Sequence, residues 1–421
     1  MTSVFENGTM FHEEAHDDFK KLEQDVRRFR PDVGCQMILE HACEIRASDI
    51  FIAANADDVE VSFRHLGVVK RIALLPSDTG RRLMAFIRAL AGMDTVEKRL
   101  AQDARWSRKL GDGRTIDLRL CTMPTIYGES FSIRILDRDS QLRSFEQLGF
   151  IGPQQGILTG LLHAPSGLIL VTGPTGAGKT TTLYACLRYL NDGKRKIHTI
   201  EDPVEYALPG LRQSQVDEAG GADFPHLLRS VLRQGPDVVM IGEIRDRATA
   251  ETAVRAANSG QLVFATLHAP IAAAAVQSML SLGVGPHFLC TSLLGVVAQR
   301  LMRTLSTKTR VPMDMSAATG MFDEVRQWLG PDDGKVVYAA AASEPDEGYV
   351  GRTGTFEIMT LSPSVRTALM ASRPAGAIAQ AATAEGMVDF RRAALIKIAQ
   401  GLTTFDEMCR VVPSLDAWAE A

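Results

Sequence analysis

Hydrophobic positions along the chain change their period repeatedly, and these changes predict alternating strands and helices. The aliphatic run Leu168–Val171 indicates a buried strand, and after a glycine-rich turn Leu183, Leu187 and Leu190 recur at helical spacing. Further apolar runs predict strands, and amphipathic patterns predict helices between them, at 196–200, 224–232, 237–243, 247–259 and 262–268. Strands that alternate with helices form parallel sheets, so this stretch is predicted to be an α/β domain with ligand groups at the carboxyl ends of its strands.

Shorter strands with strict alternation precede this domain. Apolar and polar positions alternate at residues 59–64, 116–120 and 130–136, and a helix is predicted over 80–91. The predicted organisation is a polar tail at 1–34, a small N-terminal α/β domain at 35–140, a linker at 141–150, the main α/β domain at 151–304 and a C-terminal helical region at 305–421.

The composition is that of an ordinary globular protein: of 421 residues, 45% are hydrophobic and 23% are charged, with a formal net charge of −4. This charge argues against a protein that coats nucleic acid. The six cysteines include no C-x-x-C pair, which favours a reducing cytoplasm and gives neither a disulfide framework nor a zinc site. No apolar run reaches the length of a membrane span and the N-terminus is polar, so contact with a membrane is expected only through a partner.

The glycine-rich turn carries the main chemical signature. Residues 173–180 fit G-x-x-x-x-G-K-[ST], the phosphate-binding loop. Its glycines let backbone N–H groups point at a polyphosphate, Lys179 can reach the β- and γ-phosphates, and Thr180 can offer a hydroxyl to Mg²⁺. The sequence therefore predicts a nucleotide site that takes ATP and Mg²⁺. Its predicted binding residues are Gly173, Pro174, Thr175, Gly176, Ala177, Gly178, Lys179, Thr180 and Thr181.

Side chains that could act on the nucleotide follow the next strands. Glu243 ends an apolar strand, where a carboxylate can hold the shell of Mg²⁺, usually through water. Glu201, Asp202 and Glu205 are candidates for orienting the attacking water, and one or two of them can instead cap the turn there. His268 is equally suited to sensing a γ-phosphate and to a structural role.

Three arginines of the small domain are further candidates. Arg105, Arg119 and Arg134 can be ordinary surface charges. They become relevant if that domain folds over the nucleotide, where arginine would stabilise the charge of the transition state.

The order of the motifs resembles that of the secretion-superfamily motor ATPases, which drive type II secretion and type IV pilus assembly or retraction. Sequences similar to this family's Walker A motif, Asp box, Walker B motif, His box and C-terminal signature lie, in that order, at 173–184, 199–206, 237–246, 266–268 and 293–301. The family's small domain is matched at 47–50 and 117–129, and its later glycine-rich stretch at 348–354.

The resemblance implies a homo-hexameric ring in the cytoplasm, with a PAS-like N-terminal domain, a RecA-like ATPase core and the nucleotide between them. It further implies a ring that is peripheral to the inner membrane, works there with a platform protein on pilins or pseudopilins, and does not bind nucleic acid. Matched residue by residue, it makes Glu205 the general base and Glu243 the Walker B carboxylate, with His268 in the His box. Arg105 and Arg119 match the arginines that reach the γ-phosphate, and Arg134 is a weaker match.

Four features depart from the family pattern. Assembly and secretion members usually carry a four-cysteine zinc module before the later glycine-rich stretch, whereas residues 305–310 contain no cysteine, so no zinc site is expected. Ala104 replaces the usual glycine before the first of the arginines, and Gln261 replaces the first His-box histidine. The chain is also too short for the large extra N-terminal domain through which assembly members often contact their membrane-docked partner.

The expected function is ATP hydrolysis that powers type II secretion or type IV pilus assembly. A retraction motor is the alternative within the family; the missing zinc module and the short N-terminus favour it, whereas residues 102–105 and 348–354 favour assembly or secretion. Two other classes stay open: a RecA-like nucleic-acid translocase, and a ring subunit that binds nucleotide as a structural ligand without turnover.

Overall fold

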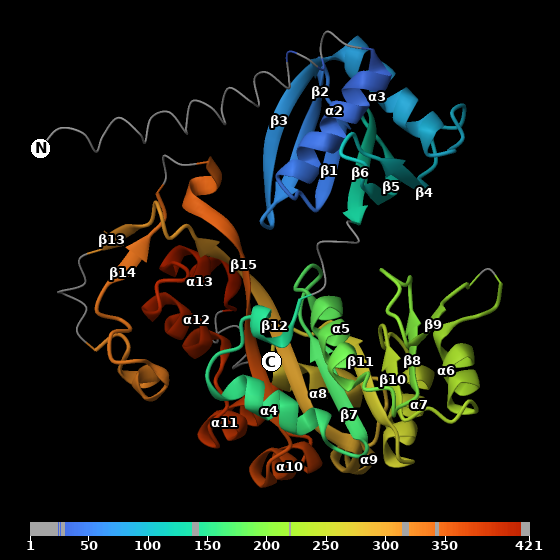
Figure 1. Ribbon diagram of the computed structural model, residues 1–421. Helices are drawn as coiled ribbons and strands as arrows, with labels where there is room; N and C mark the ends of the chain where they lie inside the picture. The colour runs from blue at the N-terminus through green and yellow to red at the C-terminus, as the bar shows by residue number, and fades with distance from the viewer. Residues whose placement is uncertain are drawn as a thin grey trace, which may run out of the picture. The chain divides into compact units, whose positions relative to one another are not determined.

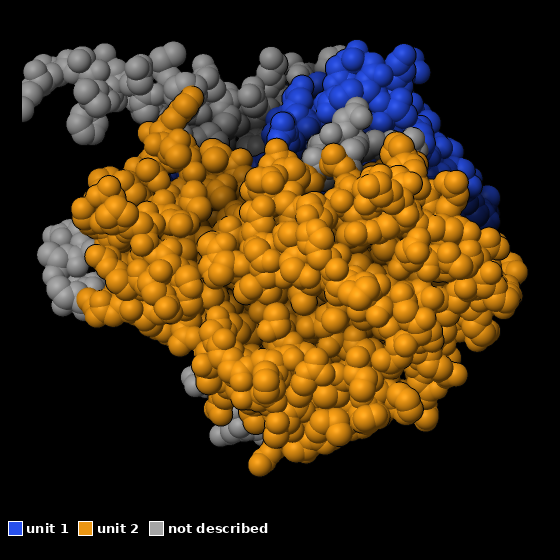
Figure 2. All heavy atoms as spheres, turned by 60° about the horizontal axis from the view of Figure 1, so that its bottom comes forward, with its two compact units in different colours: residues 1–141, 341–348 blue, residues 142–340, 349–421 orange. Residues whose placement is uncertain are grey.

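The computed structural model describes residues 24, 26, 30–136, 143–218, 220–313, 320–341 and 345–413. Most of the predicted N-terminal tail and the start of the predicted linker lie outside the described residues. The chain divides into two compact units, residues 1–141 with 341–348 and residues 142–340 with 349–421 (Figure 2).

The first unit is a six-stranded antiparallel sheet with two helices packed on it (Figure 1). The strand order is β3-β2-β1-β6-β5-β4, and the elements span Pro31–Glu44 (α2), Asp49–Ala54 (β1), Asp58–His65 (β2), Val68–Pro76 (β3), Ser77–Leu90 (α3), Gln102–Lys109 (β4), Thr115–Thr125 (β5) and Gly128–Leu136 (β6). Alternate residues of β5, namely Ile116, Leu118 and Leu120, are buried in the core with α2 and α3, as their spacing predicts. Helix α3 lies close to β2 because position 80 is glycine; a Cβ there would come within 2.3 Å of the Cβ of Val59.

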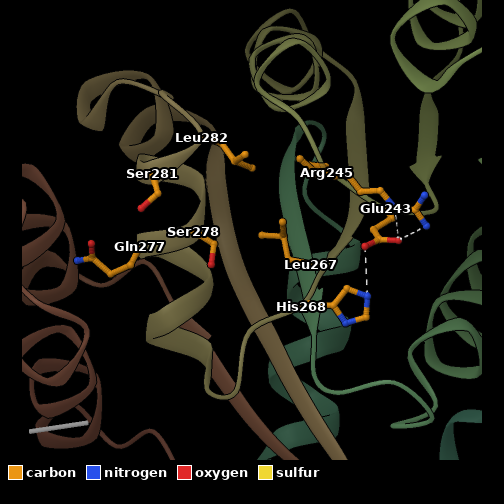
Figure 3. Close-up of a pocket in the computed structure, with 9 residues that line it drawn as sticks. Glu243, Arg245, Leu267, His268, Gln277, Ser278, Ser281 and Leu282 are labelled. Atoms are coloured by element: carbon orange, nitrogen blue, oxygen red, sulfur yellow. Dashed lines mark hydrogen bonds and ion pairs between the residues drawn. The ribbon is translucent and has the colours of Figure 1, made fainter. Parts of the chain in front are cut away.

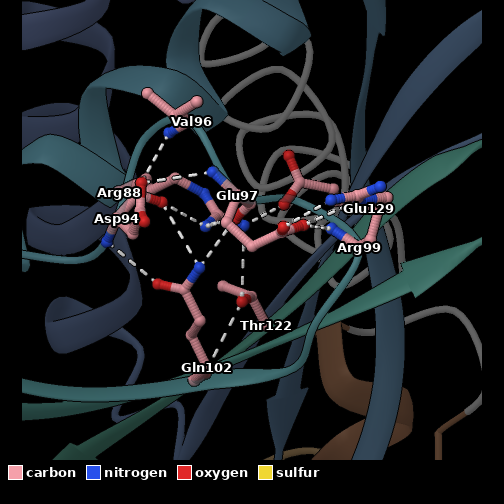
Figure 4. Close-up of polar contacts among 8 residues, drawn as sticks. All are labelled: Arg88, Asp94, Val96, Glu97, Arg99, Gln102, Thr122 and Glu129. Atoms are coloured by element: carbon pink, nitrogen blue, oxygen red, sulfur yellow. Dashed lines mark hydrogen bonds and ion pairs between the residues drawn. The ribbon is translucent and has the colours of Figure 1, made fainter.

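A buried arginine fixes the segment between α3 and β4 (Figure 4). Arg88 of α3 is 1% exposed, and its guanidinium donates to the carbonyl oxygens of Asp94 at 2.7 Å and Glu97 at 3.2 Å. The same guanidinium forms an ion pair with Glu129 of β6. The amide of Gln102 also donates to the Glu97 carbonyl, at 2.7 Å. The start of β4, the strand that carries Arg105, is therefore held by the helix and by β6.

The second unit is built on a seven-stranded sheet of order β15-β12-β7-β11-β10-β8-β9. Neighbouring strands are parallel except for β15, which runs antiparallel to β12. The strands span Gly167–Thr172 (β7), Ile197–Glu201 (β8), Arg212–Gln215 (β9), Val238–Ile241 (β10), Leu262–Leu267 (β11), Leu293–Leu305 (β12) and Tyr349–Thr360 (β15). The predicted strands of the parallel core are confirmed, and β7, which leads into the phosphate loop, lies inside the sheet between β12 and β11.

Helices cover both faces of this sheet, and two cores use alternate residues of its strands. Leu168 and Leu170 of β7 pack in the core with α6 to α11, whereas Ile169 and Val171 pack in the core with α4 and α5. Strands buried on both faces are apolar at nearly every position, which explains their unbroken hydrophobic runs. The helices span Pro153–Leu162 (α4), Lys179–Leu190 (α5), Phe224–Leu232 (α6), Arg247–Asn258 (α7), Ala272–Ser281 (α8), Pro286–Ser292 (α9), Pro363–Met370 (α10) and Ala375–Ala384 (α11).

The C-terminal region was predicted to be helical, but it also contains strands, one of which completes the main sheet. Helices α12 (Phe390–Ala399) and α13 (Phe405–Val411) follow α11, whereas β15 extends the sheet and a small antiparallel pair forms from β13 (Val311–Met313) and β14 (Val337–Ala339). The glycine-rich first half of β15 hides its strand pattern. Residues 305–310 stand where the family pattern has the first cysteines of its zinc module. Within this stretch, Arg310 lies over the ring of Tyr338, 3.9 Å from its centre, and donates to the Gly401 carbonyl at 2.6 Å.

Over the described part of the chain, the helices are too short or too polar to cross a membrane.

Candidate functional site

The phosphate loop lies between β7 and α5, and its backbone needs glycine. Gly173, Gly176 and Gly178 have φ angles of 146°, 76° and 86°, a region that other residues rarely adopt. Gly173 is also in contact with β12, because a Cβ there would lie 2.3 Å from the carbonyl oxygen of Gln299. The side chain of Gln299, which is 1% exposed, donates to the Ala177 carbonyl at 2.7 Å. Strand β12 thus supports both ends of the loop, whose shape suits a bound phosphate chain.

The remaining loop residues lie where a nucleotide could reach them. Pro174 and Thr175 are exposed, and Thr180 and Thr181, in the first turn of α5, are half-buried. The ammonium of Lys179 donates to the carbonyls of Gly173 at 2.7 Å and Pro174 at 3.2 Å. Partial burial lowers the pKa of Lys179, and the nearby Glu243 carboxylate opposes this shift.

Glu243 and His268 come together at the carboxyl ends of β10 and β11 (Figure 3). His268 Nε2 lies 3.2 Å from Glu243 Oε1, and His268 Nδ1 lies 3.5 Å from the ammonium of Lys179. A neutral imidazole protonated on Nε2 satisfies both contacts, since it donates to the carboxylate and accepts from the ammonium. The imidazole therefore links Lys179 of the phosphate loop to the Glu243 carboxylate.

Arg245 completes this group of charges. Its guanidinium donates to Glu243 Oε2 through Nε at 2.8 Å and Nη2 at 2.7 Å, and Nη1 lies 3.6 Å from Asp202. Glu243, Arg245 and His268 line one side of an open depression of about 520 Å³, with residues of α8 such as Ser278 on the other side. Arg245 lies within the motif at 237–246, but the sequence did not show that its guanidinium pairs with the Glu243 carboxylate.

The turn after β11 is fastened to the strand before the phosphate loop. The hydroxyl of Thr172, the last residue of β7, accepts from the N–H of Ala269 at 2.8 Å. The same hydroxyl lies within hydrogen-bond distance of the carbonyls of Leu267 at 3.1 Å and Ala269 at 3.0 Å. His268 is therefore held between two residues that contact β7, which fixes its distance from the loop.

The three acidic candidates of the Asp box have different surroundings. Glu201 is 3% exposed, and its carboxylate accepts from Tyr184, from Thr199 at 2.5 Å and from Gln213 at 3.1 Å. A carboxylate with these partners has little capacity left for water. Asp202 is exposed and Glu205 is half-exposed.

The residues present fit Mg²⁺ and a nucleotide. Mg²⁺ prefers oxygen ligands and keeps several waters. Thr180 would supply a hydroxyl at the start of α5, and Glu243 a carboxylate just after β10, which β11 separates from β7 in the sheet, with water as the expected link.

The arginines of the first unit form one row across its sheet. Arg105 of β4 lies directly opposite Arg119 of β5, and Arg119 lies opposite Arg134 of β6. Directly opposed residues share a face of the sheet. The next place in the row is Asp49 of β1, whose carboxylate lies 3.1 Å from Arg134 Nε and 3.4 Å from Nε of Arg64, the residue opposite it on β2. Hairpin register, which the sequence did not reveal, thus gathers these side chains into a strip of positive charge.

Gln261, which replaces a histidine of the family pattern, lies away from this site. It precedes β11 and so lies at the amino end of the strand that His268 follows. Its carbonyl accepts from the N–H of Gly167, the first residue of β7. Gln261 therefore makes a backbone contact at the amino ends of the parallel strands, whereas the phosphate loop lies at their carboxyl ends.

The chain is similar to proteins of bacterial secretion and pilus systems. A family profile described as "Type II/IV secretion system protein" matches residues 27–410. The chain is 40% identical over 376 residues to the type II secretion system protein E of Dickeya dadantii, covering 89% of this chain and 74% of that protein. It is 36% identical over 375 residues to the type IV pilus assembly ATPase PilB of Acinetobacter baylyi, covering 89% of this chain and 65% of that protein.

Solved structures resemble the chain over most of its length. The pilus retraction motor PilT, solved with bound ADP, matches with a TM-score of 0.58 and 25% identity over 91% of this chain and 98% of that chain. The ATPase DotB of Legionella pneumophila matches with a TM-score of 0.68 and 19% identity over 91% of this chain and 96% of that chain, which supports the fold.

Proposed function

The chain belongs to the type II/IV secretion system protein family, and from that premise we propose that it hydrolyses ATP to power type II secretion or type IV pilus assembly. The observation that carries the proposal is the linked group of Lys179, His268 and Glu243. It joins a phosphate-binding lysine to a metal-type carboxylate through an imidazole, at the edge of the sheet where α/β proteins bind their ligands.

The proposed mechanism relies on positioning and charge. The N–H groups of residues 173–180 bind the phosphates, and Lys179 exchanges its carbonyl contacts for phosphate oxygens. Thr180 and, through water, Glu243 would hold Mg²⁺, and the bound ion would supply neutralisation of phosphate charge. His268 contacts the γ-phosphate or the leaving phosphate from the end of β11.

Glu205 is the proposed general base. It takes a proton from the attacking water as the water oxygen bonds to the γ-phosphorus and the bond from that phosphorus to the bridging oxygen of the leaving ADP breaks. It returns the proton to solvent after the products leave. The existing partners of Glu201 support this choice, because Tyr184, Thr199 and Gln213 already occupy its oxygens. Arg105 and Arg119 are proposed to stabilise charge on the γ-phosphate, and their adjacent places in one row support a joint role.

The proposed assembly is a homo-hexamer in the cytoplasm, at the inner membrane through a platform protein. A retraction motor is the second candidate. Residues 305–310 favour it, because this stretch carries the Arg310–Tyr338 contact rather than the first cysteines of a zinc module.

The test measures phosphate release from ATP by the full chain, over a range of protein concentrations, with Mg²⁺ and with EDTA. We expect turnover that needs Mg²⁺ and rises steeply with concentration, and that falls about 10²- to 10⁴-fold in Glu205→Gln while ADP still binds. Glu385→Gln, which alters an exposed carboxylate of the same unit, is the matched control.

Three outcomes would contradict the proposal. A parent protein that assembles but shows no turnover is a structural nucleotide-binding subunit. Full activity in Glu205→Gln removes this residue as the base. Turnover stimulated by DNA supports a nucleic-acid translocase instead.

A further inference from the structure

The turn that follows β11 has further attachments besides those to Thr172. The carbonyl of Pro270 accepts from Arg300 Nη2 at 3.1 Å. The N–H of Ala272 donates to Glu357 Oε2 at 2.9 Å. Pro270 and Ala272 come two and four residues after His268, so these bonds fix the segment next to the imidazole.

Glu357 caps two helices at once. Ala272 is the first residue of α8 and Phe390 is the first residue of α12, and the Phe390 N–H donates to Glu357 Oε1 at 3.2 Å. First-turn N–H groups have no acceptor within their own helix, and the positive end of a helix favours a nearby carboxylate. The side chain is 4% exposed. A single buried carboxylate on β15 therefore holds the starts of both helices.

Arg300 joins the same two segments independently. Its guanidinium carbon lies 5.4 Å from the centre of the Phe390 ring, while Nη2 holds Pro270. The register of β12 and β15 places Glu357 opposite Ala298, two residues from Arg300, so both side chains project from one face of a paired element. Each attachment to the turn is thus matched by an attachment to α12.

We propose that Glu357 and Arg300 are positioning residues, which hold the His268 turn in place beside the phosphate loop and tie its position to helix α12. The inference rests on the proposed function, where His268 contacts the terminal phosphate. It also adds to that function, because it names α12 as the element whose position is coupled to that of the turn.

The surroundings of Glu357 make the attachment sensitive to pH near neutrality. Burial raises its pKa to about 7, while the two backbone N–H groups and Arg300 favour the charged form, and Asp389 at the start of α12 opposes it. The protonated carboxyl has one oxygen fewer to accept with, so one helix start loses its acceptor below this pH. The turn is expected to be held most firmly when Glu357 is ionised.

The test is Glu357→Gln in the full chain. An amide oxygen can accept from one of the two N–H groups, and its NH₂ group then faces the other. We expect hydrogen exchange, followed by mass spectrometry without nucleotide, to quicken about tenfold or more in the peptide that contains residues 268–272. We further expect kcat for ATP to fall with ADP affinity unchanged, and Arg300→Met to do the same, with Arg300→Lys restoring part of the loss.

The control is again Glu385→Gln, which leaves both helix starts intact. Unchanged exchange at 268–272 in Glu357→Gln overturns the inference, as does faster exchange spread evenly over the whole unit with lost ADP affinity, which marks a merely structural role. Local opening that leaves Glu357 buried should become rarer in the parent as pH rises through about 7. The exchange of this peptide, corrected for its intrinsic rate and measured where global unfolding does not contribute, should therefore slow, and Glu357→Gln should lose this dependence. Should the parent show no ATP turnover, the proposed function fails, while the exchange measurement still decides the attachment.

Discussion

Replacing Gly173 by alanine should damage the phosphate loop more than the same change at Gly176. Both glycines have positive φ angles, 146° and 76°, so alanine is strained at either position, by about 1 to 3 kcal/mol. The two positions differ in their surroundings. A Cβ at 173 would lie 2.3 Å from the Gln299 carbonyl oxygen, which is backbone and cannot move aside, whereas a Cβ at 176 has nothing within 4 Å.

The difference between the two variants therefore measures the contact of the loop with β12. Overpacking of this kind costs about 1 to 3 kcal/mol, so Gly173→Ala should bind ADP about 5- to 150-fold more weakly than Gly176→Ala if the loss falls on the binding conformation. The assay is titration of a fluorescent ADP analogue, with urea unfolding of each variant to separate lost affinity from lost fold. Equal affinities in two folded variants would refute the argument that β12 sets the shape of the loop.

Three further predictions test other parts of the site and its support. Lys179→Met should weaken ADP binding about ten- to a hundredfold, since it removes an ammonium proposed to bind phosphate. Lys194→Met, at an exposed position, is the control. An ADP titration curve unchanged in Lys179→Met would contradict the prediction. Glu407→Ala should lower the free energy of unfolding, measured in urea, by about 3 to 5 kcal/mol, because Glu407 is fully buried and pairs with the buried Arg303 at 2.6 Å. A loss below about 1 kcal/mol would show that the fold does not need this pair. Burial raises the pKa of Glu357 from 4.5 to about 7, so the folded state holds this proton more tightly than the unfolded state. The free energy of global unfolding of the parent should therefore fall by about 3 kcal/mol relative to that of Glu357→Gln as pH rises from 4.5 past 7. Urea unfolding of both proteins at stepped pH measures this difference, and parallel curves would contradict the shift.

The sequence predicted the parallel core because its signals are local. The apolar run before Gly173, the glycines themselves and the carboxylate after β10 lie within short windows, and each pattern has one common structural explanation. Strand β15 was missed because its glycine-rich half has no clear period, and because it pairs with β12 across about fifty residues of sequence.

The details of the site depend on contacts that no short window contains. Glu201 and Glu205 look alike in the sequence, and only the structure shows that Glu201 is buried, with Tyr184 and Gln213 bonded to its carboxylate. Glu357 was not singled out, because a lone glutamate within a strand pattern gives no sign of capping two helices.

The arginine row of the first unit has a consequence for the lifetime of the protein. Like charges directly opposite one another on neighbouring strands repel, and Arg105, Arg119 and Arg134 occupy consecutive places in such a row. Asp49 follows them and is shared between Arg134 and Arg64. An anion that settles on the row removes this repulsion, so its binding and the folding of the sheet are thermodynamically linked. Occupancy of the row by an anionic ligand would therefore raise the free energy of unfolding of this unit and lengthen the lifetime of the folded protein.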